Sequence, residues 1–392
     1  MNGRKVLVLD GRSLSCLAFV RSLGSAGAEV HVGESFRHNI SAYSCYTQEN
    51  HVHPSADEDT TAFRDWLLKL VEQERYDFVV PTRDATTIAL AALQDDFAAP
   101  TSTLLSTPEN VAVLNDKGRC AELAEDVGVP IPTTYHPTGT PIKEIADAAD
   151  FPVLVKPTSA SGARGIVRVE DPGELAAAYE SVTVNSGPAI VQEFVDHSGG
   201  HFSVGTVFDR NSEPRAVHVY EELVQYPDSG GPAVEAISVE VEPWVDDLLD
   251  ILRAIDWVGP AHMDVLLDPE DGTYRLLEVN PRIWMSIGLT VRSGVNVPRI
   301  TWDIANGGNP EPVTTYRTGL RYRWVLPSQV LWAGSGDRKL ERTKWLLRPR
   351  DEPTCYGVLS KCDPQATLGV LTQSLSFVLD AEKRQAVLDR GL

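Results

Sequence analysis

Asp264, Glu278 and Asn280 have the side chains and the spacing of a site for a hard cation. Asp264 lies in one apolar segment, and Glu278 lies in the next, Tyr274–Val279, after a turn that contains proline and glycine. Side chains alternate along a strand, so Glu278 and Asn280 share a face, and Asp264 faces the same side if the strands pair. Such oxygen ligands suit Mg²⁺ bridged to phosphates, and Arg282 is placed to neutralise a transferring phosphoryl group. The other interpretation is a hairpin edge with two exposed carboxylates.

A lysine at the end of an apolar strand is the second candidate. Lys156 closes Pro152–Pro157 and precedes Thr158–Ile166, a loop rich in small residues. Small residues let backbone N–H groups surround a phosphate, and a lysine adds a compact positive charge beside them. The loop lacks the spacing G-x-x-x-x-G-K-[ST], which excludes a P-loop. A solvated lysine before a flexible turn is the alternative.

The third candidate is the end of an apolar strand, Ile190–Val195. The strand breaks at Asp196–Gly200, so its edge is able to offer an adenine ring one backbone acceptor and one donor, while Phe194 and Val195 pack against the ring. A plain core strand is the competing interpretation.

Short strands and helices must position these residues. In the first hundred residues, apolar strands at Lys5–Leu9, Glu29–Val32 and Phe78–Pro81 alternate with helical stretches at Leu14–Ser25 and Thr61–Glu74. That rhythm predicts a parallel α/β sheet. The first strand is not followed by G-x-G-x-x-G, so the Rossmann-like unit carries no dinucleotide fingerprint.

A second domain is expected after the connector at Pro100–Pro108. Helical spacing over Asn110–Val127 leads to a strand, small-residue loop, strand, helix and strand pattern between Pro152 and Val195. Strand-like sequence then fills Ser203–Val241, and Trp244–Ile255 reads as a helix. Beyond Pro310 the pattern is less legible.

Composition narrows the class of protein. The chain has 392 residues and a net charge of −20, which disfavours nucleic acid as a partner because phosphate binding needs a basic face. Only nine of its 35 basic residues are lysine, as in salt-adapted cytoplasmic proteins such as haloarchaeal ones, or in the product of a GC-rich genome. Five scattered cysteines and a short N-terminal apolar run predict a cytoplasmic chain without a membrane segment.

Taken in order, these motifs resemble the ATP-grasp superfamily, and within it the carboxylate–amine ligase group. The resemblance runs from about Lys5 to Pro310, and Leu277–Arg282 is its most specific element. It implies an ATP-grasp fold with an N-terminal Rossmann-like pre-ATP-grasp domain at 1–106. An ATP-grasp domain follows at 107–310, divided into an α+β lid at about 130–193 and a catalytic subdomain at about 194–310. Residues 311–392 form an extension that either caps the catalytic subdomain or makes a subunit interface.

The resemblance also implies roles for individual residues. The metal ligands would be Asp264, Glu278 and Asn280, and the catalytic residues Arg282 and Lys156. The implied ATP-binding residues are Lys117, Lys156, Ser159, Ser161, Gly162, Gly165, Gln192, Glu193, Phe194, Val195 and His201. His201 stands where many members have an acidic ribose contact, so Glu193 or Glu221 are alternatives for that contact.

The implied reaction uses ATP with Mg²⁺, or Mn²⁺, to convert a substrate carboxylate to an acyl phosphate that an amine then attacks. A thiol or bicarbonate acceptor, a carboxylate kinase and a non-catalytic ATP-binding regulator are the alternatives. The partners expected are small molecules and a second copy of the chain, without nucleic acid or membrane.

A few other residues carry weaker signals. Arg83 and Asp84 follow a strand and would touch substrate or cap a helix, and Trp284, Ser286 and Arg292 would form an acceptor pocket. Glu235 would favour an amine-bearing substrate. His51 and His53 share a strand face as metal ligands would, but a surface strand is favoured because no third ligand lies nearby in the sequence.

Overall fold

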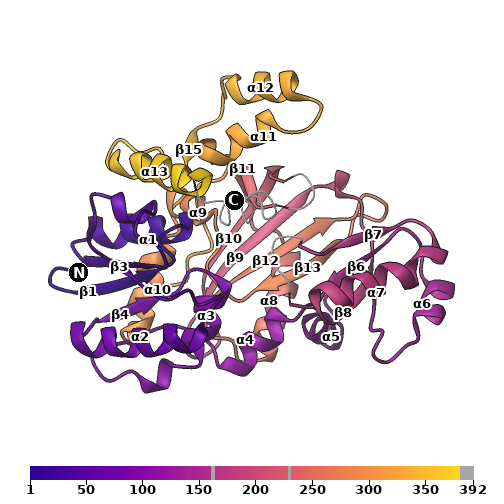
Figure 1. The fold of residues 1–392 in the computed structure, drawn as a ribbon, viewed down its shortest axis with the longest axis horizontal. Coiled ribbons are helices and arrows are strands. Elements are labelled where there is room, and N and C mark those ends of the chain that lie inside the picture. Colours follow the sequence, from indigo (N-terminus) through magenta and orange to yellow (C-terminus); the bar gives the residue numbers. More distant parts are fainter. Residues whose placement is uncertain (160–163, 228–230, 380–392) are drawn as a thin grey trace.

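The computed structural model describes residues 1–159, 164–227 and 231–379 and builds them around three sheets. A four-stranded parallel sheet holds the N-terminal region, a seven-stranded sheet runs through the middle, and a small four-stranded sheet lies at the far end (Figure 1). Within these residues no helix is long and apolar enough to cross a bilayer.

The N-terminal sheet confirms the predicted βαβ rhythm. Its strands are ordered β3-β2-β1-β4, and all pair in parallel. Leu7 and Leu9 pack on one face with α2, and Val6 and Val8 pack on the other with α1. The elements are β1 (Lys5–Leu9), α1 (Leu14–Ser25), β2 (Glu29–Glu34), β3 (Thr47–Val52), α2 (Thr60–Glu74), β4 (Phe78–Val80) and α3 (Asp84–Ala91).

The helical stretch predicted over Asn110–Val127 is two helices, α4 (Pro108–Asn115) and α5 (Lys117–Asp126). Asp116 separates them with extended backbone, and its side chain accepts hydrogen bonds from the amides of Gly118 and Arg119. An aspartate in this position satisfies amides that the first helical turn leaves unpaired. The break sets Lys117 at the very start of α5.

The small sheet is antiparallel, with the order β5-β8-β6-β7, and α6 and α7 pack against it. Its core is aliphatic and separate from the other two cores. The elements are β5 (Thr134–Tyr135), α6 (Ile142–Ala148), β6 (Val153–Pro157), β7 (Val167–Val169), α7 (Leu175–Ser186) and β8 (Ala189–Glu193).

The central sheet has the order β13-β12-β9-β10-β11-β14-β15. Met263 and Val265 pack with α8 on one face, which leaves Asp264 on the opposite face because side chains alternate along β12. The elements are β9 (His201–Phe208), β10 (Pro214–Gln225), β11 (Ala233–Val239), α8 (Trp244–Ala254), β12 (Gly259–Leu267), β13 (Tyr274–Asn280), α9 (Ile287–Ser293) and α10 (Val297–Ala305).

The chain beyond residue 310 joins both large sheets. β14 extends the central sheet beside β11, and β15 pairs in parallel with β14. Asp363 accepts hydrogen bonds from Arg21 and Ser44 of the N-terminal region. The elements are β14 (Arg321–Arg323), α11 (Val330–Gly334), α12 (Lys339–Leu347), β15 (Thr354–Tyr356) and α13 (Gln365–Leu379).

Glu235 on β11 is enclosed by this C-terminal part. Its carboxylate lies 2.8 Å from Arg321, 3.1 Å from Arg350 and 2.7 Å from the Gln329 amide, and its side chain is fully buried. Burial raises the pKa of Glu235, but hydrogen bonds and charges from the arginines outweigh burial and lower it below its usual range. The expectation that Glu235 meets a substrate amine is not met in this structure, because arginines from later in the chain already surround it.

We predict that Glu235→Gln destabilises the protein by about 3 kcal/mol, because buried arginines lose their counter-charge. Denaturant unfolding measures the loss, with the exposed Glu240→Gln as a control. A lowered carboxylate pKa adds stability above the unfolded-state pKa, so the gap between the two proteins should close as the pH falls through the folded pKa. Equal stability of both variants at pH 7 would contradict this account.

Candidate active site

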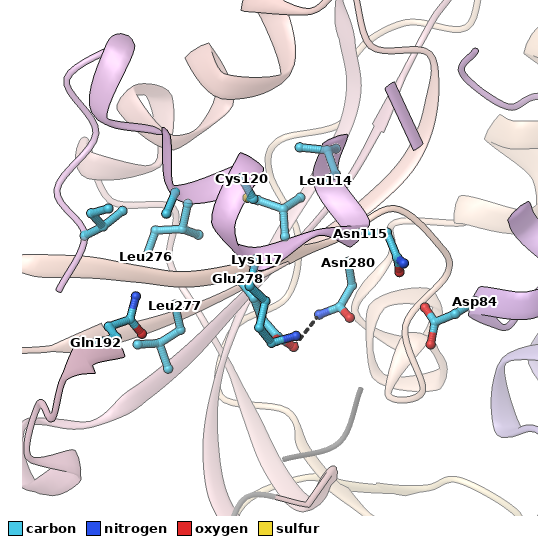
Figure 2. A pocket seen from close by; sticks show the side chains of 13 residues that line it. Asp84, Leu114, Asn115, Lys117, Cys120, Gln192, Leu276, Leu277, Glu278 and Asn280 are labelled. Carbon is cyan, nitrogen blue, oxygen red and sulfur yellow. Dashed lines mark hydrogen bonds and ion pairs between the residues drawn. The ribbon is translucent and has the colours of Figure 1, made fainter. Parts of the chain in front are cut away.

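Strands β12 and β13 bring the predicted oxygen ligands together. Asp264 pairs directly with Glu278, and His262 pairs with Asn280. The Asn280 amide nitrogen lies 3.1 Å from an oxygen of Asp264 and 3.1 Å from an oxygen of Glu278. The side-chain alternation that predicted this convergence is therefore observed (Figure 2 shows Glu278 beside Asn280).

Lys117 lies against the same carboxylate. Its ammonium is 2.9 Å from Glu278, and its backbone amide donates to the Thr158 carbonyl at 2.8 Å, which ties the start of α5 to the segment after Lys156. Burial raises the pKa of Glu278, but the charge and hydrogen bond of Lys117 outweigh burial and lower it to about 2. Glu278 is thus an anion at any physiological pH.

Lys156 is buried at the end of β6 and donates to the side-chain oxygen of Gln192 at 2.5 Å. Gln192 donates in turn to the Thr134 hydroxyl at 2.8 Å, so the small sheet holds the lysine in place. Burial lowers the pKa of Lys156 to about 8, and the neighbouring charge of Lys117 acts in the same direction, against the attraction of Glu278.

The loop after Lys156 is described at both ends. Ser159 is exposed, and Gly165 has a φ of +70°, a conformation that favours glycine. A Cβ at Gly165 would lie 2.8 Å from the Ser186 hydroxyl. Ser161 and Gly162 lie outside the described residues.

The predicted adenine edge has two of its amides engaged within the protein. The amide of Glu193 donates to the Thr133 carbonyl, and that of Phe194 donates to the Pro152 carbonyl. The Arg168 guanidinium lies 3.9 Å from the centre of the Phe194 ring. Val195, which is buried, follows directly.

Arg282 joins the central sheet to the N-terminal region. Its guanidinium donates to Asp84 at 2.6 Å and to the Asn280 side-chain oxygen at 3.2 Å. Burial lowers the pKa of Arg282, but the charge of Asp84 outweighs burial and raises it, so the guanidinium is permanently charged. Of the weaker candidates, Asp84 therefore reaches the site, whereas Arg83 forms an ion pair with Asp57.

Sequence reasoning missed a group on strands β9 and β10. The Ser203 hydroxyl lies 2.8 Å from an oxygen of Glu222 and 3.2 Å from an oxygen of Asp264, so it shares one proton between the two carboxylates. Glu222 and Asp264 each lie 3.9 Å from a ring nitrogen of His201. His201 therefore neighbours the carboxylates, and it is Glu222, not the adjacent Glu221, that shares its side of the sheet. Side chains alternate along β10, so one of these two glutamates must face His201, but only the register with β9 shows which one.

Of the three residues expected to form an acceptor pocket, two are buried in the protein. Trp284 is buried, stacks on His262 and donates to Thr290, so it belongs to the core. Ser286 is buried as well, whereas Arg292 is exposed at the end of α9.

A pocket opens between the three sheets at this point (Figure 2). It collects two carboxylates, the Lys117 ammonium group and three side-chain amides beside an apolar wall, and Lys156 is hydrogen-bonded to one of these amides, Gln192. Its lining comprises Asp84, Leu114, Asn115, Lys117, Cys120, Ala121, Ile131, Gln192 and Leu276–Asn280. Carboxylates that suit a divalent cation, lysines that suit phosphates and apolar side chains that suit a base are the components of a nucleotide site.

Comparison with known families agrees with this arrangement. The family model for the ATP-grasp domain matches residues 114–286. This match confirms the resemblance to the ATP-grasp superfamily, and the structural neighbours confirm the fold class.

Three similar proteins illustrate the relationship. The N-terminal section of the carbamoyl phosphate synthase large chain of Methanopyrus kandleri is 26% identical over 283 residues, which cover 67% of this chain and 49% of the relative. The D-alanine–D-alanine ligase of Halorhodospira halophila is 30% identical over 173 residues, 42% of this chain and 55% of that one. The biotin carboxylase domain dimer of Hydrogenobacter thermophilus 2-oxoglutarate carboxylase, solved with MgADP and bicarbonate, aligns with a TM-score of 0.65 and 16% identity over 81% of this chain and 73% of that one.

The chain spans half or less of the length of the curated relatives it matches first. At 16% sequence identity, the similarity to this solved structure is evidence for the fold only.

We predict that Lys156 titrates near pH 8, well below exposed lysines, because burial disfavours its charged form. Lys117→Met should raise this pKa, since it removes a neighbouring positive charge. NMR of protein labelled at the lysine ε-carbon measures both, and only nine lysines contribute signals. A Lys156 signal that titrates with the exposed lysines would refute the burial argument.

Proposed function

We propose that this protein is an ATP-dependent ligase that activates a substrate carboxylate as an acyl phosphate and joins it to an amine, releasing ADP and phosphate. The observation that carries the proposal is the convergence of Asp264, Glu278 and Asn280 beside Lys117. The match to the ATP-grasp domain over residues 114–286 supports it.

The chemistry of the donor set fits a magnesium ion. Two carboxylates and one amide oxygen are hard ligands, and Asp264 and Glu278 both reach the same Asn280 amide. We assign Asp264, Glu278 and Asn280 as the residues that would hold Mg²⁺, or Mn²⁺ in its place. The ion would supply charge neutralisation on the phosphates of ATP.

Different residues are assigned to the phosphates and to the adenine of ATP. Lys117 and Lys156 would contact phosphates together with the loop that includes Ser159, Ser161, Gly162 and Gly165. For the adenine, Glu193 and Phe194 have their amides engaged, so Val195 is the candidate backbone donor. Gln192 orients Lys156, and His201 lies on the metal side of the pocket.

Arg282 is the group we assign to the transferring phosphoryl. Its contacts with Asp84 and Asn280 aim a permanent positive charge at the carboxylate cluster. A substrate carboxylate oxygen would attack the γ-phosphorus while the bond to ADP breaks, and the amine would then displace phosphate from the acyl carbon. Fixed charges placed before the reaction stabilise the developing charge without reorganisation.

We also propose the wider organisation of the enzyme. The pre-ATP-grasp domain is assigned to 1–106 and the ATP-grasp domain to 107–310, with the lid at 130–193, and the extension at 311–392 caps the catalytic subdomain. A homodimer is supported by the dimeric biotin carboxylase domain among the structural neighbours. Five free thiols suit a reducing cytoplasm.

The test is phosphate release by purified protein with MgATP, pooled carboxylates and pooled amines, at low and high KCl. Release that needs both pools, with a product one water lighter than its two substrates, is the expected result. Release with carboxylates alone would instead indicate a kinase or an acceptor of another class, and bicarbonate or thiol dependence would identify that class.

We predict that Glu278→Gln lowers turnover by about 100-fold while nucleotide binding weakens far less, because the variant loses charge where the phosphoryl group transfers. The exposed Glu270→Gln in the β12–β13 turn is the matched control and should retain full activity. Turnover is measured by ADP formation and binding by calorimetry with ADP. Wild-type turnover in Glu278→Gln would place the metal site elsewhere.

A further inference from the structure

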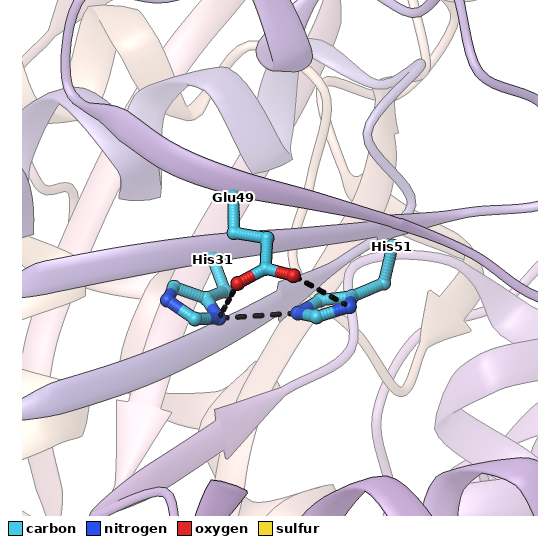
Figure 3. A group of neighbouring side chains, drawn as sticks. All are labelled: His31, Glu49 and His51. Atoms are coloured by element: carbon cyan, nitrogen blue, oxygen red, sulfur yellow. Dashed lines mark hydrogen bonds and ion pairs between the residues drawn. The ribbon is translucent and has the colours of Figure 1, made fainter.

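Two histidines of the N-terminal sheet face one another across strands β2 and β3. The register pairs His31 with Glu49, and His51 follows Glu49 by two residues, so all three side chains lie on one face. The Nδ1 atom of His31 lies 3.1 Å from the Nε2 atom of His51 (Figure 3). His31 of the neighbouring strand and Glu49 of the same strand thus join His51, whereas His53 lies beyond the end of β3 and is not part of the group.

The other nitrogen of each imidazole is directed at a carboxylate. His31 Nε2 lies 3.1 Å from Glu29, and His51 Nδ1 lies 3.7 Å from Glu49. At His31 the hydrogen-bonded carboxylate holds the proton on Nε2 and leaves Nδ1 with its lone pair, the arrangement found behind metal-binding histidines. At His51 the carboxylate is beyond hydrogen-bond distance, so that contact does not fix the tautomer, and metal binding would select the one with its lone pair on Nε2.

The hydroxyl of Tyr76 lies 3.0 Å from His31 Nδ1 and 3.1 Å from His51 Nε2, and a Glu49 oxygen lies 3.8 Å from His31 Nδ1. A cation between the two imidazoles would accept a lone pair from each ring. Atoms that bind Zn²⁺ at 2.0–2.1 Å in a tetrahedron lie about 3.3 Å apart, close to the 3.1 Å between the two ring nitrogens.

Charge and access also favour a cation. Glu29, Glu49 and Glu74 surround the group, against one nearby positive charge, Lys5. The His31 side chain is 3% exposed and that of His51 13%, whereas Glu49 is 56% exposed and opens the group to solvent. Imidazole ligands select zinc-like transition metals over Mg²⁺.

We propose that His31, His51 and Glu49 form a binding site for a divalent transition metal such as Zn²⁺, with the Tyr76 hydroxyl beside the ion. A metal ion there would connect edge strand β3 to β2, beside Tyr76 of the segment before β4. It is separate from the carboxylates of the central sheet, since its residues lie on another sheet.

Zinc stoichiometry in three full-length variants tests the proposal, measured by calorimetry and by metal analysis after dialysis. Asp264→Asn weakens the central carboxylate group, which includes His201 and Glu222 and is a second place for zinc. In that background we expect one zinc per chain, and none after His51→Gln is added. The matched control adds His38→Gln, an exposed histidine of the same region, and should keep one zinc.

Stability provides a second readout. Saturating zinc should raise the melting temperature of Asp264→Asn by several degrees and leave that of Asp264→Asn/His51→Gln unchanged. Glu49→Gln, which alters an exposed side chain, should weaken zinc binding at least tenfold without unfolding the protein. Equal zinc binding by Asp264→Asn and Asp264→Asn/His51→Gln would overturn the proposal.

Discussion

The contact between Lys117 and Glu278 depends on two separate pieces of the chain and organises the pocket around it. Asp116 ends one helix and caps the next, which sets Lys117 at the first position of α5. Glu278 owes its place to the pairing of β12 with β13. The ion pair keeps a buried carboxylate charged, and through Asn280 it aligns Asp264 as well. Without that positive charge, burial alone would favour the protonated acid.

Three parts of the chain supply polar groups to the pocket. The central sheet provides Glu278 and Asn280, the small sheet provides Gln192, which holds Lys156, and α3 of the N-terminal region provides Asp84. The Arg282–Asp84 contact means that the first unit is part of the site and not only a neighbour. The C-terminal part contacts both large sheets' regions: its arginines bind Glu235 of the central sheet, and its Asp363 binds Arg21 of the N-terminal region.

The parts that sequence predicted well are those governed by local rules. Strand alternation correctly grouped Asp264, Glu278 and Asn280, and apolar periodicity found α1, α2 and α8 nearly to the residue. The failures have non-local causes. Glu235 was misjudged because its arginine partners lie about 90 to 115 residues later in the chain. Glu222 escaped notice because only the register with β9 reveals which of two adjacent glutamates faces the carboxylates.

A crystal structure with Mg²⁺ and a non-hydrolysable ATP analogue tests the central claim most directly. The account predicts that the ion lies on Asp264, Glu278 and Asn280, and that the ammonium groups of Lys117 and Lys156 contact the phosphates. Nucleotide bound elsewhere, with the Lys117–Glu278 pair intact and no metal on β12 and β13, would contradict it.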